Sequence, residues 1–97
     1  MTHENEEWVS LYHLAVLELE HAKMTGRIGD TRTAITARLE KLANMPGLHE
    51  EEREAIEDAL NNLKVLEREE ARYQAEEQRI AARALEELRR VADRFSK

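Results

Sequence analysis

The sequence predicts an all-α protein in which two shorter helices pack against a long C-terminal helix. Charged residues make up 37% of the 97 residues and aromatic residues only 4%, a balance typical of long helices and coiled coils. Residues 48–97 contain neither glycine nor proline and consist mostly of good helix formers. An unbroken helix there is about 70 Å long, too long for a small globule. We therefore expect it to project and to self-associate in a coiled-coil-like manner.

The first helix is expected at about residues 6–21. One face of it carries apolar residues at spacings of three and four, the pattern of an amphipathic helix. These residues are Trp8, Leu11, Tyr12, Ala15 and Leu19. Leu14 and Leu17 lie on the opposite face, and a helix that is apolar on two sides is usually covered by a further element or subunit.

The second helix is expected at about residues 25–44, after a tight turn at residues 22–24. An alternative start at Thr31, with Asp30 as the N-cap, remains open, because Gly26 and Gly29 each weaken a helix by about 1 kcal/mol. The earlier start is favoured by a continuous apolar row. That row is Met24, Ile28, Ile35, Leu39 and Leu42. Pro46 and Gly47 then mark a short connection.

The third helix is expected at about residues 49–96, in one piece. Its apolar residues thin out over residues 67–79 and then return. Leu66, Tyr73 and Ile80 are spaced by sevens across this polar segment, which favours a continuous helix. The alternative is a four-helix bundle with a turn within residues 67–79. The expected core of the single domain 1–97 is Trp8, Leu11, Tyr12, Ile35, Leu39, Leu42, Ile56, Leu60 and Leu63.

No constellation of catalytic residues is visible, so we expect a protein that is not an enzyme and that needs no cofactor. The chain has no cysteine, which excludes disulfides and thiolate metal sites. Glu18 and His21 have the E-x-x-H spacing of di-iron bundles, but that site needs a second pair and two further Glu. A chance spacing is the preferred interpretation. The N-terminus shows no signal peptide and the longest apolar run, residues 14–17, cannot span a bilayer, so a cytoplasmic protein is expected.

Charge alternates in blocks along the chain. Residues 1–20 and 48–78 carry net charges of −5 and −7, and residues 21–47 and 79–97 each carry +3. Because the long helix is acidic at its start and basic at its end, we expect an antiparallel homodimer with a two-fold axis near Tyr73, or pairing with another helical protein. The interface candidates are Tyr73, Ile80, Leu88, Val91, Phe95, Leu14 and Leu17.

The alternative function is binding of nucleic acid or an anionic surface by the basic end of the long helix. The residues that would make these contacts are Arg83, Arg89, Arg90 and Arg94. Glu86, Glu87 and Asp93 interrupt this basic segment, and the whole chain carries a net charge of −6. A structural or protein–protein interaction module is therefore the favoured function.

Part of the sequence resembles a group of small uncharacterised bacterial helical proteins. The residues that carry the resemblance are Trp8, Leu11, Tyr12, Ala15, Glu18, Lys23, Met24, Arg27, Ile28, Ala34, Ile35, Arg38 and Leu39. The likeness extends over residues 8–66, departs from the pattern at Gly26 and Gly29, and leaves out the C-terminal third. It implies a helical hairpin and no assigned activity.

Overall fold

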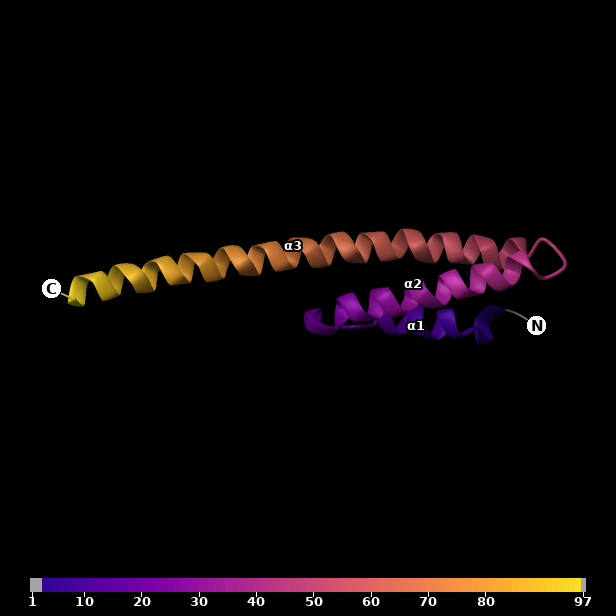
Figure 1. The fold of residues 1–97 in the computed structure, drawn as a ribbon, viewed down its shortest axis with the longest axis horizontal. Helices are drawn as coiled ribbons and strands as arrows, with labels where there is room; N and C mark the ends of the chain where they lie inside the picture. The colour runs from indigo at the N-terminus through magenta and orange to yellow at the C-terminus, as the bar shows by residue number, and fades with distance from the viewer. Residues whose placement is uncertain (1–2, 97) are drawn as a thin grey trace.

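The computed structural model describes residues 3–96, which form a short 3-10 helix followed by three α-helices. The elements are η1 (His3–Asn5), α1 (Glu7–Val16), α2 (His21–Ala43) and α3 (Glu50–Phe95). α1 and α2 form a hairpin that lies along the first half of α3, and the second half of α3 projects beyond it (Figure 1). The molecule measures 78 × 17 × 16 Å. The predicted all-α fold with a long C-terminal helix is confirmed.

The polar segment 67–79 is part of one continuous helix of 46 residues. The alternative with a turn in this segment is therefore wrong. The segment carries good helix formers and no glycine or proline, so nothing in it opposes the i to i+4 hydrogen bonds of the flanking turns.

The connection between α1 and α2 differs from the prediction. α1 ends at Val16 and not near residue 21, and α2 begins at His21, so the turn lies at residues 17–20 and not at 22–24. The carboxylate of Glu18 accepts hydrogen bonds from the backbone N–H groups of Leu19 (3.1 Å) and Glu20 (3.2 Å). These bonds fix the conformation of the turn and place a carboxylate just before the N-terminus of α2, where the helix dipole is positive. Asp30 is inside α2 and is not an N-cap.

The connection between α2 and α3 has two residues in the left-handed region of backbone conformation. Gly47 has φ 97° and His49 has φ 51°; glycine adopts such a φ without steric cost. The ring Nε2 of His49 lies 2.8 Å from the carbonyl oxygen of Pro46. This compact loop reverses the chain, so that α2 and α3 run antiparallel (Figure 1).

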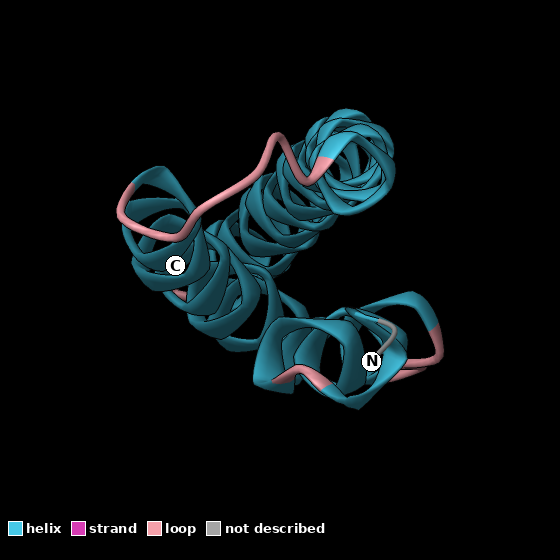
Figure 2. Ribbon diagram, turned by 90° about the vertical axis from the view of Figure 1, so that its right-hand side faces the viewer, coloured by secondary structure: helices cyan, strands magenta, loops and turns pink. Residues whose placement is uncertain are grey.

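α2 is the central one of the three helices and contacts both of the others. α1 packs against α2, and α2 packs against α3, whereas α1 and α3 have few direct contacts. Seen along the helices, the three are arranged as a V with α2 at its corner (Figure 2). One side of the short bundle is consequently open.

The buried apolar core confirms part of the predicted core. Its members are Trp8, Ala15, Ile28, Ile35, Leu42, Ile56, Ala59 and Leu63. Four residues predicted for the core, Leu11, Tyr12, Leu39 and Leu60, are only half-buried. Of these, Tyr12 lines the open side of the V, where no helix covers it. Ala15, Ile28 and Ala59 were not among the predicted core residues.

Replacing Leu63 by Ala should destabilise the fold by about 2–5 kcal/mol, the usual cost of a cavity in a packed core. Its side chain is fully buried. Leu60→Ala is the matched control on the same helix, and because Leu60 is half-buried it should cost roughly 1 kcal/mol. Urea unfolding at one fixed protein concentration measures both. An equal or larger loss at Leu60 would contradict the packing described above.

Candidate interaction surface

The most exposed part of the molecule is the second half of α3, residues 75–95, which we call the arm. Every residue from 71 to 96 is exposed. The hairpin ends where the ring of His21 stacks on that of Tyr73, with centroids 3.4 Å apart and planes at 6°. Because α2 begins at His21, it covers α3 only as far as Tyr73, and the arm has no neighbour among the other described residues, 3–74 (Figure 1).

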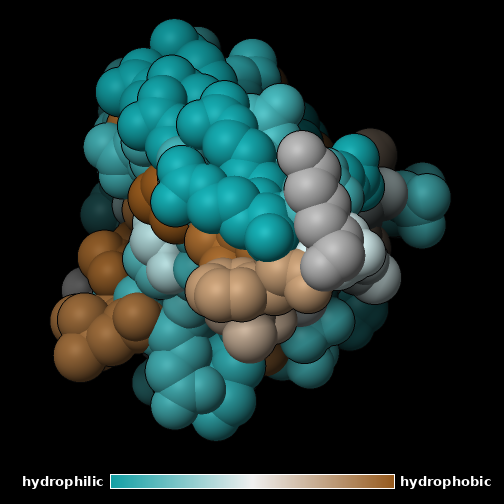
Figure 3. Space-filling view, turned by 90° about the vertical axis from the view of Figure 1, so that its left-hand side faces the viewer, coloured by the Kyte–Doolittle hydropathy of each residue, from teal (hydrophilic) through white to brown (hydrophobic). Residues whose placement is uncertain are grey.

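The arm carries an uncovered apolar row. Its residues are Ile80, Ala84, Leu88, Val91 and Phe95. At 3.6 residues per turn they lie within a sector roughly 80° wide, which includes the positions of the buried Ala59 and the half-buried Leu66 and lies next to those of Ile56 and Leu63. Phe95 is 82% exposed and Leu88 is 66% exposed. Viewed from the C-terminal end, apolar side chains are open to solvent beside a hydrophilic upper face (Figure 3). The apolar face of α3 thus continues beyond the part that the hairpin covers.

The remaining interface candidates lie at the tip of the hairpin. Leu14 and Leu17 are exposed, as is Leu19 at 91%. Leu19 was predicted on the core face of the first helix; this is wrong, because α1 ends at Val16 and the following turn rotates Leu19 outwards. Tyr73 donates a hydrogen bond from its hydroxyl to Glu77 Oε1 (3.0 Å), and that bond raises the pKa of Tyr73.

A buried carboxylate joins all three helices. Glu52 accepts hydrogen bonds from Trp8 Nε1 (3.1 Å) and from Arg38 through Nε (2.7 Å) and Nη2 (2.9 Å). Its side chain is 8% exposed, and the bonds from Arg38 lower the pKa of its carboxyl. Arg38 also lies 3.3 Å from Glu6. Glu52 thus differs from the other acids at the start of α3, which are exposed: it is a buried anion that holds the three helices together.

A second buried carboxylate fixes the start of α2. Glu70 Oε2 lies 2.7 Å from His21 Nδ1, and the Glu70 side chain is 7% exposed. Glu18 is not part of this contact: it accepts a hydrogen bond from Arg27 Nε (3.0 Å), which lowers the pKa of its carboxyl. The E-x-x-H pair thus has two separate structural roles. Within residues 3–96, no group of three or more His, Asp or Glu side chains is placed to hold a metal ion.

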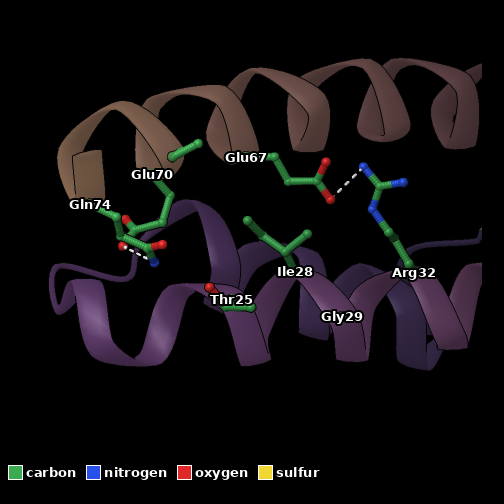
Figure 4. A pocket seen from close by; sticks show the side chains of 8 residues that line it. Thr25, Ile28, Gly29, Arg32, Glu67, Glu70 and Gln74 are labelled. Atoms are coloured by element: carbon green, nitrogen blue, oxygen red, sulfur yellow. Dashed lines mark hydrogen bonds and ion pairs between the residues drawn. The ribbon is translucent and has the colours of Figure 1, made fainter. Parts of the chain in front are cut away.

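A hollow of about 330 Å³ lies between α2 and α3 next to Glu70. Ile28 and Arg32 from α2 face Glu67 and Glu70 from α3 across it (Figure 4). Arg32 Nη2 approaches Glu67 Oε1 to 2.9 Å, but its N–H is not directed at an acceptor in the described part of the chain. The contact is therefore an ion pair without a well-formed hydrogen bond, and it contributes little to stability at this half-exposed position.

The arginines that were considered for binding nucleic acid or an anionic surface do not form a basic surface. Arg83, Arg89, Arg90 and Arg94 are all exposed. Arg90 lies 3.5 Å from Glu87, and Arg79 pairs with Glu76. Residues 75–96 contain as many acids as bases, so the arm has no net positive charge to attract a polyanion.

No protein-family model, curated protein or solved structure matches the chain. The fold and the arm define its class: a small, extended, all-helical protein with exposed apolar residues that suggest an interaction surface. The resemblance to small bacterial helical proteins is confirmed only in the all-helical fold. Across residues 3–96, no helix has the length and apolar character needed to cross a membrane.

Proposed function

We propose that this protein is a non-enzymatic interaction module that acts through helix packing, and that the arm is its binding surface. The observation that carries the proposal is the apolar row of the arm, which has the spacing of a packed helix face but is not covered by any other part of residues 3–96. Contiguous exposed apolar surface of this kind usually marks a protein–protein contact. We propose a second copy of the chain as the partner.

The apolar row can supply enough free energy for a stable dimer. Burying a large apolar side chain is worth roughly 1.5–3 kcal/mol, and the arm offers Ile80, Leu88, Val91 and Phe95. For two arms, allowing for partial burial in the free chain, the gain is on the order of 10 kcal/mol. The entropic cost of association is roughly 4–15 kcal/mol. With a cost in the lower half of this range, the apolar row alone gives a dimer of moderate affinity.

The charges of α3 favour an antiparallel arrangement. Its start carries exposed acids, which are Glu50, Glu51, Glu54, Glu57 and Asp58. Its end carries the exposed bases Arg83, Arg89, Arg90 and Arg94. Two parallel α3 helices would bring like charges together at both ends, whereas antiparallel helices with a two-fold axis near Tyr73 bring acid to base. Such complementarity fixes orientation even where each pair adds little stability.

Val91→Glu should weaken self-association by about 100-fold or more, because it places an unpaired charge in an apolar contact. Ala82→Glu is the matched control, since Ala82 lies on the other side of the same exposed helix. Sedimentation equilibrium over a range of concentrations measures both variants against the parent chain. A parent chain that stays monomeric at high concentration overturns the proposal. A mobility shift of DNA or RNA at low salt would instead support the alternative function.

A further inference from the structure

An open trough with a volume of about 590 Å³ separates α1 from α3. Its apolar lining is Trp8, Val9 and Tyr12 of α1 and Ala55 and Ala59 of α3, and its polar lining is His3, His13 and Asp58. α2 forms the corner of the V, and α1 and α3 form its two sides (Figure 2). Two side-chain hydrogen bonds, Trp8 to Glu52 and Asn62 to Tyr12, join these sides. The arrangement is that of a four-helix bundle with one helix missing.

We propose that the arm of a second copy fills this trough as the fourth helix. Two copies would then exchange arms, and each arm would complete the bundle of the other chain. This inference rests on the proposed self-association and specifies where the arm is bound.

The directions of the helices agree with this exchange. α1 and α3 run the same way, and α2 runs opposite to both (Figure 1). An arm from an antiparallel partner also runs opposite to α1 and α3. Every neighbouring pair in the completed bundle is then antiparallel, which is the up-and-down arrangement of common four-helix bundles.

The axial positions can also be matched. The arm is about 31 Å long and α1, which forms one side of the trough, about 15 Å, at 1.5 Å per residue, so the second half of the arm would lie against α1. A two-fold axis level with Tyr73 brings together positions equally far from it along the two α3 helices. Val91 then lies level with the partner's Ala55, and Ala84 lies level with the partner's Asn62. Asn62 bonds the hydroxyl of Tyr12 across the trough (2.8 Å), so the arm would extend along the part of the trough lined by Tyr12.

The apolar row is on the correct side of α3. The side that faces the trough carries Ala55, and at 3.6 residues per turn Ile80 and Val91 follow it by about seven and ten whole turns. These residues therefore point the same way as Ala55. A two-fold axis perpendicular to α3 places equivalent sides of the two α3 helices against each other. Ile80 and Val91 would thus face the partner's trough.

Charge at the rim supports the same occupant. Exposed acids at the start of α3 lie near Ala55, at the mouth of the trough: Glu51, Glu54 and Asp58. The end of the arm, which would lie at this mouth in the antiparallel arrangement, carries Arg90 and Arg94, together with Glu87, with which Arg90 pairs. Ion pairs of Arg90 and Arg94 with the acids at the rim would thus add to the apolar contact.

A pair of cysteines, Ala55→Cys with Val91→Cys in one chain, tests the exchange. The parent chain has no cysteine. Within one chain the two positions are about 54 Å apart along a single helix, so a disulfide between them can form only between chains. We expect mild oxidation to give a covalent dimer on a non-reducing gel. The control pair, Ala55→Cys with Ala82→Cys, has the same number of thiols but places one on the wrong side of the arm, and should remain largely monomeric on the gel.

A third variant separates the outcomes. Ala84→Cys alone, at the middle of the apolar row, should form a disulfide only if two arms pair with each other along the arm itself. A dimer in sedimentation that forms the Ala84 crosslink and not the 55–91 crosslink would overturn the exchange while leaving self-association in place. Equal crosslinking of the control pair would also overturn the exchange, because it would show that the disulfides arise from random collisions between chains. A monomeric parent chain would remove both proposals.

Discussion

Glu52→Gln should destabilise the fold by about 3 kcal/mol, although it only replaces one carboxylate oxygen by an amide group of nearly the same size. Glu52 is buried against Trp8 and Arg38, and removing one member of a buried ion pair leaves the other charge without compensation, at a cost of roughly 3–5 kcal/mol. The lower value applies here because Arg38 keeps 15% of its side chain exposed. Urea unfolding of the two chains at neutral pH measures the difference.

A double variant tests whether the lost pairing is the cause. Glu52→Gln combined with Arg38→Met removes both charges, so that neither remains buried without its partner, and replacing both groups of such a pair can be nearly neutral. We expect the double variant to be more stable than Glu52→Gln alone. If the double variant loses the sum of both single losses, the two residues do not interact energetically.

The same variant has a predicted pH dependence. The hydrogen bonds from Arg38 lower the pKa of Glu52 from its ordinary value of 4.5. A carboxyl with a depressed pKa in the folded state stabilises the fold fully above its unfolded pKa, and this stabilisation is lost as the pH falls through the folded pKa. The difference between the parent chain and Glu52→Gln should therefore be constant above about pH 5.5 and shrink at lower pH. A constant difference down to about pH 2 would assign the loss to packing and not to charge.

The long helix was predictable from the sequence because its causes are local. Residues 48–97 combine helix-forming side chains with a seven-residue spacing at Leu66, Tyr73 and Ile80, and neither depends on the other helices. The turn between α1 and α2 was predicted some four residues too late. That turn depends on the hydrogen bonds of Glu18 with Arg27 and on the stacking of His21 on Tyr73. Those partners are brought together only by the fold.

The buried acids were missed for a related reason. An acid in a helical sequence is usually a solvated residue, and the sequence analysis does not single out Glu52 or Glu70. The available signal was its position: Glu52 precedes Ile56 by one turn, and Glu70 follows Leu63 by seven residues, so both lie on the core face of α3. Only the approach of Arg38 and His21 from α2 makes burial there favourable. The trough likewise follows from how α1 rests on α2, which periodicity does not specify.

Gln74→Pro should abolish self-association while leaving the hairpin folded on the first half of α3. Proline at this position removes the hydrogen bond to the carbonyl of Glu70 and its ring clashes with that carbonyl, at a cost of about 3 kcal/mol or more in a helix interior. The helix can relieve this clash by kinking at the boundary between the covered part of α3 and the arm. A kinked arm no longer extends in line with the bundle, so it cannot reach along the trough of a second copy.

Gln74→Ala is the matched control, because it removes the same side chain and keeps a good helix former in place. Far-UV circular dichroism should show a modest loss of helix for the proline variant, and urea unfolding should still report a cooperative transition of the bundle. Sedimentation equilibrium should give a monomer for Gln74→Pro and a dimer for Gln74→Ala. Dimers of equal affinity in both variants would show that association does not depend on the straight continuation of α3, and the arm would then have to bind as an independent segment.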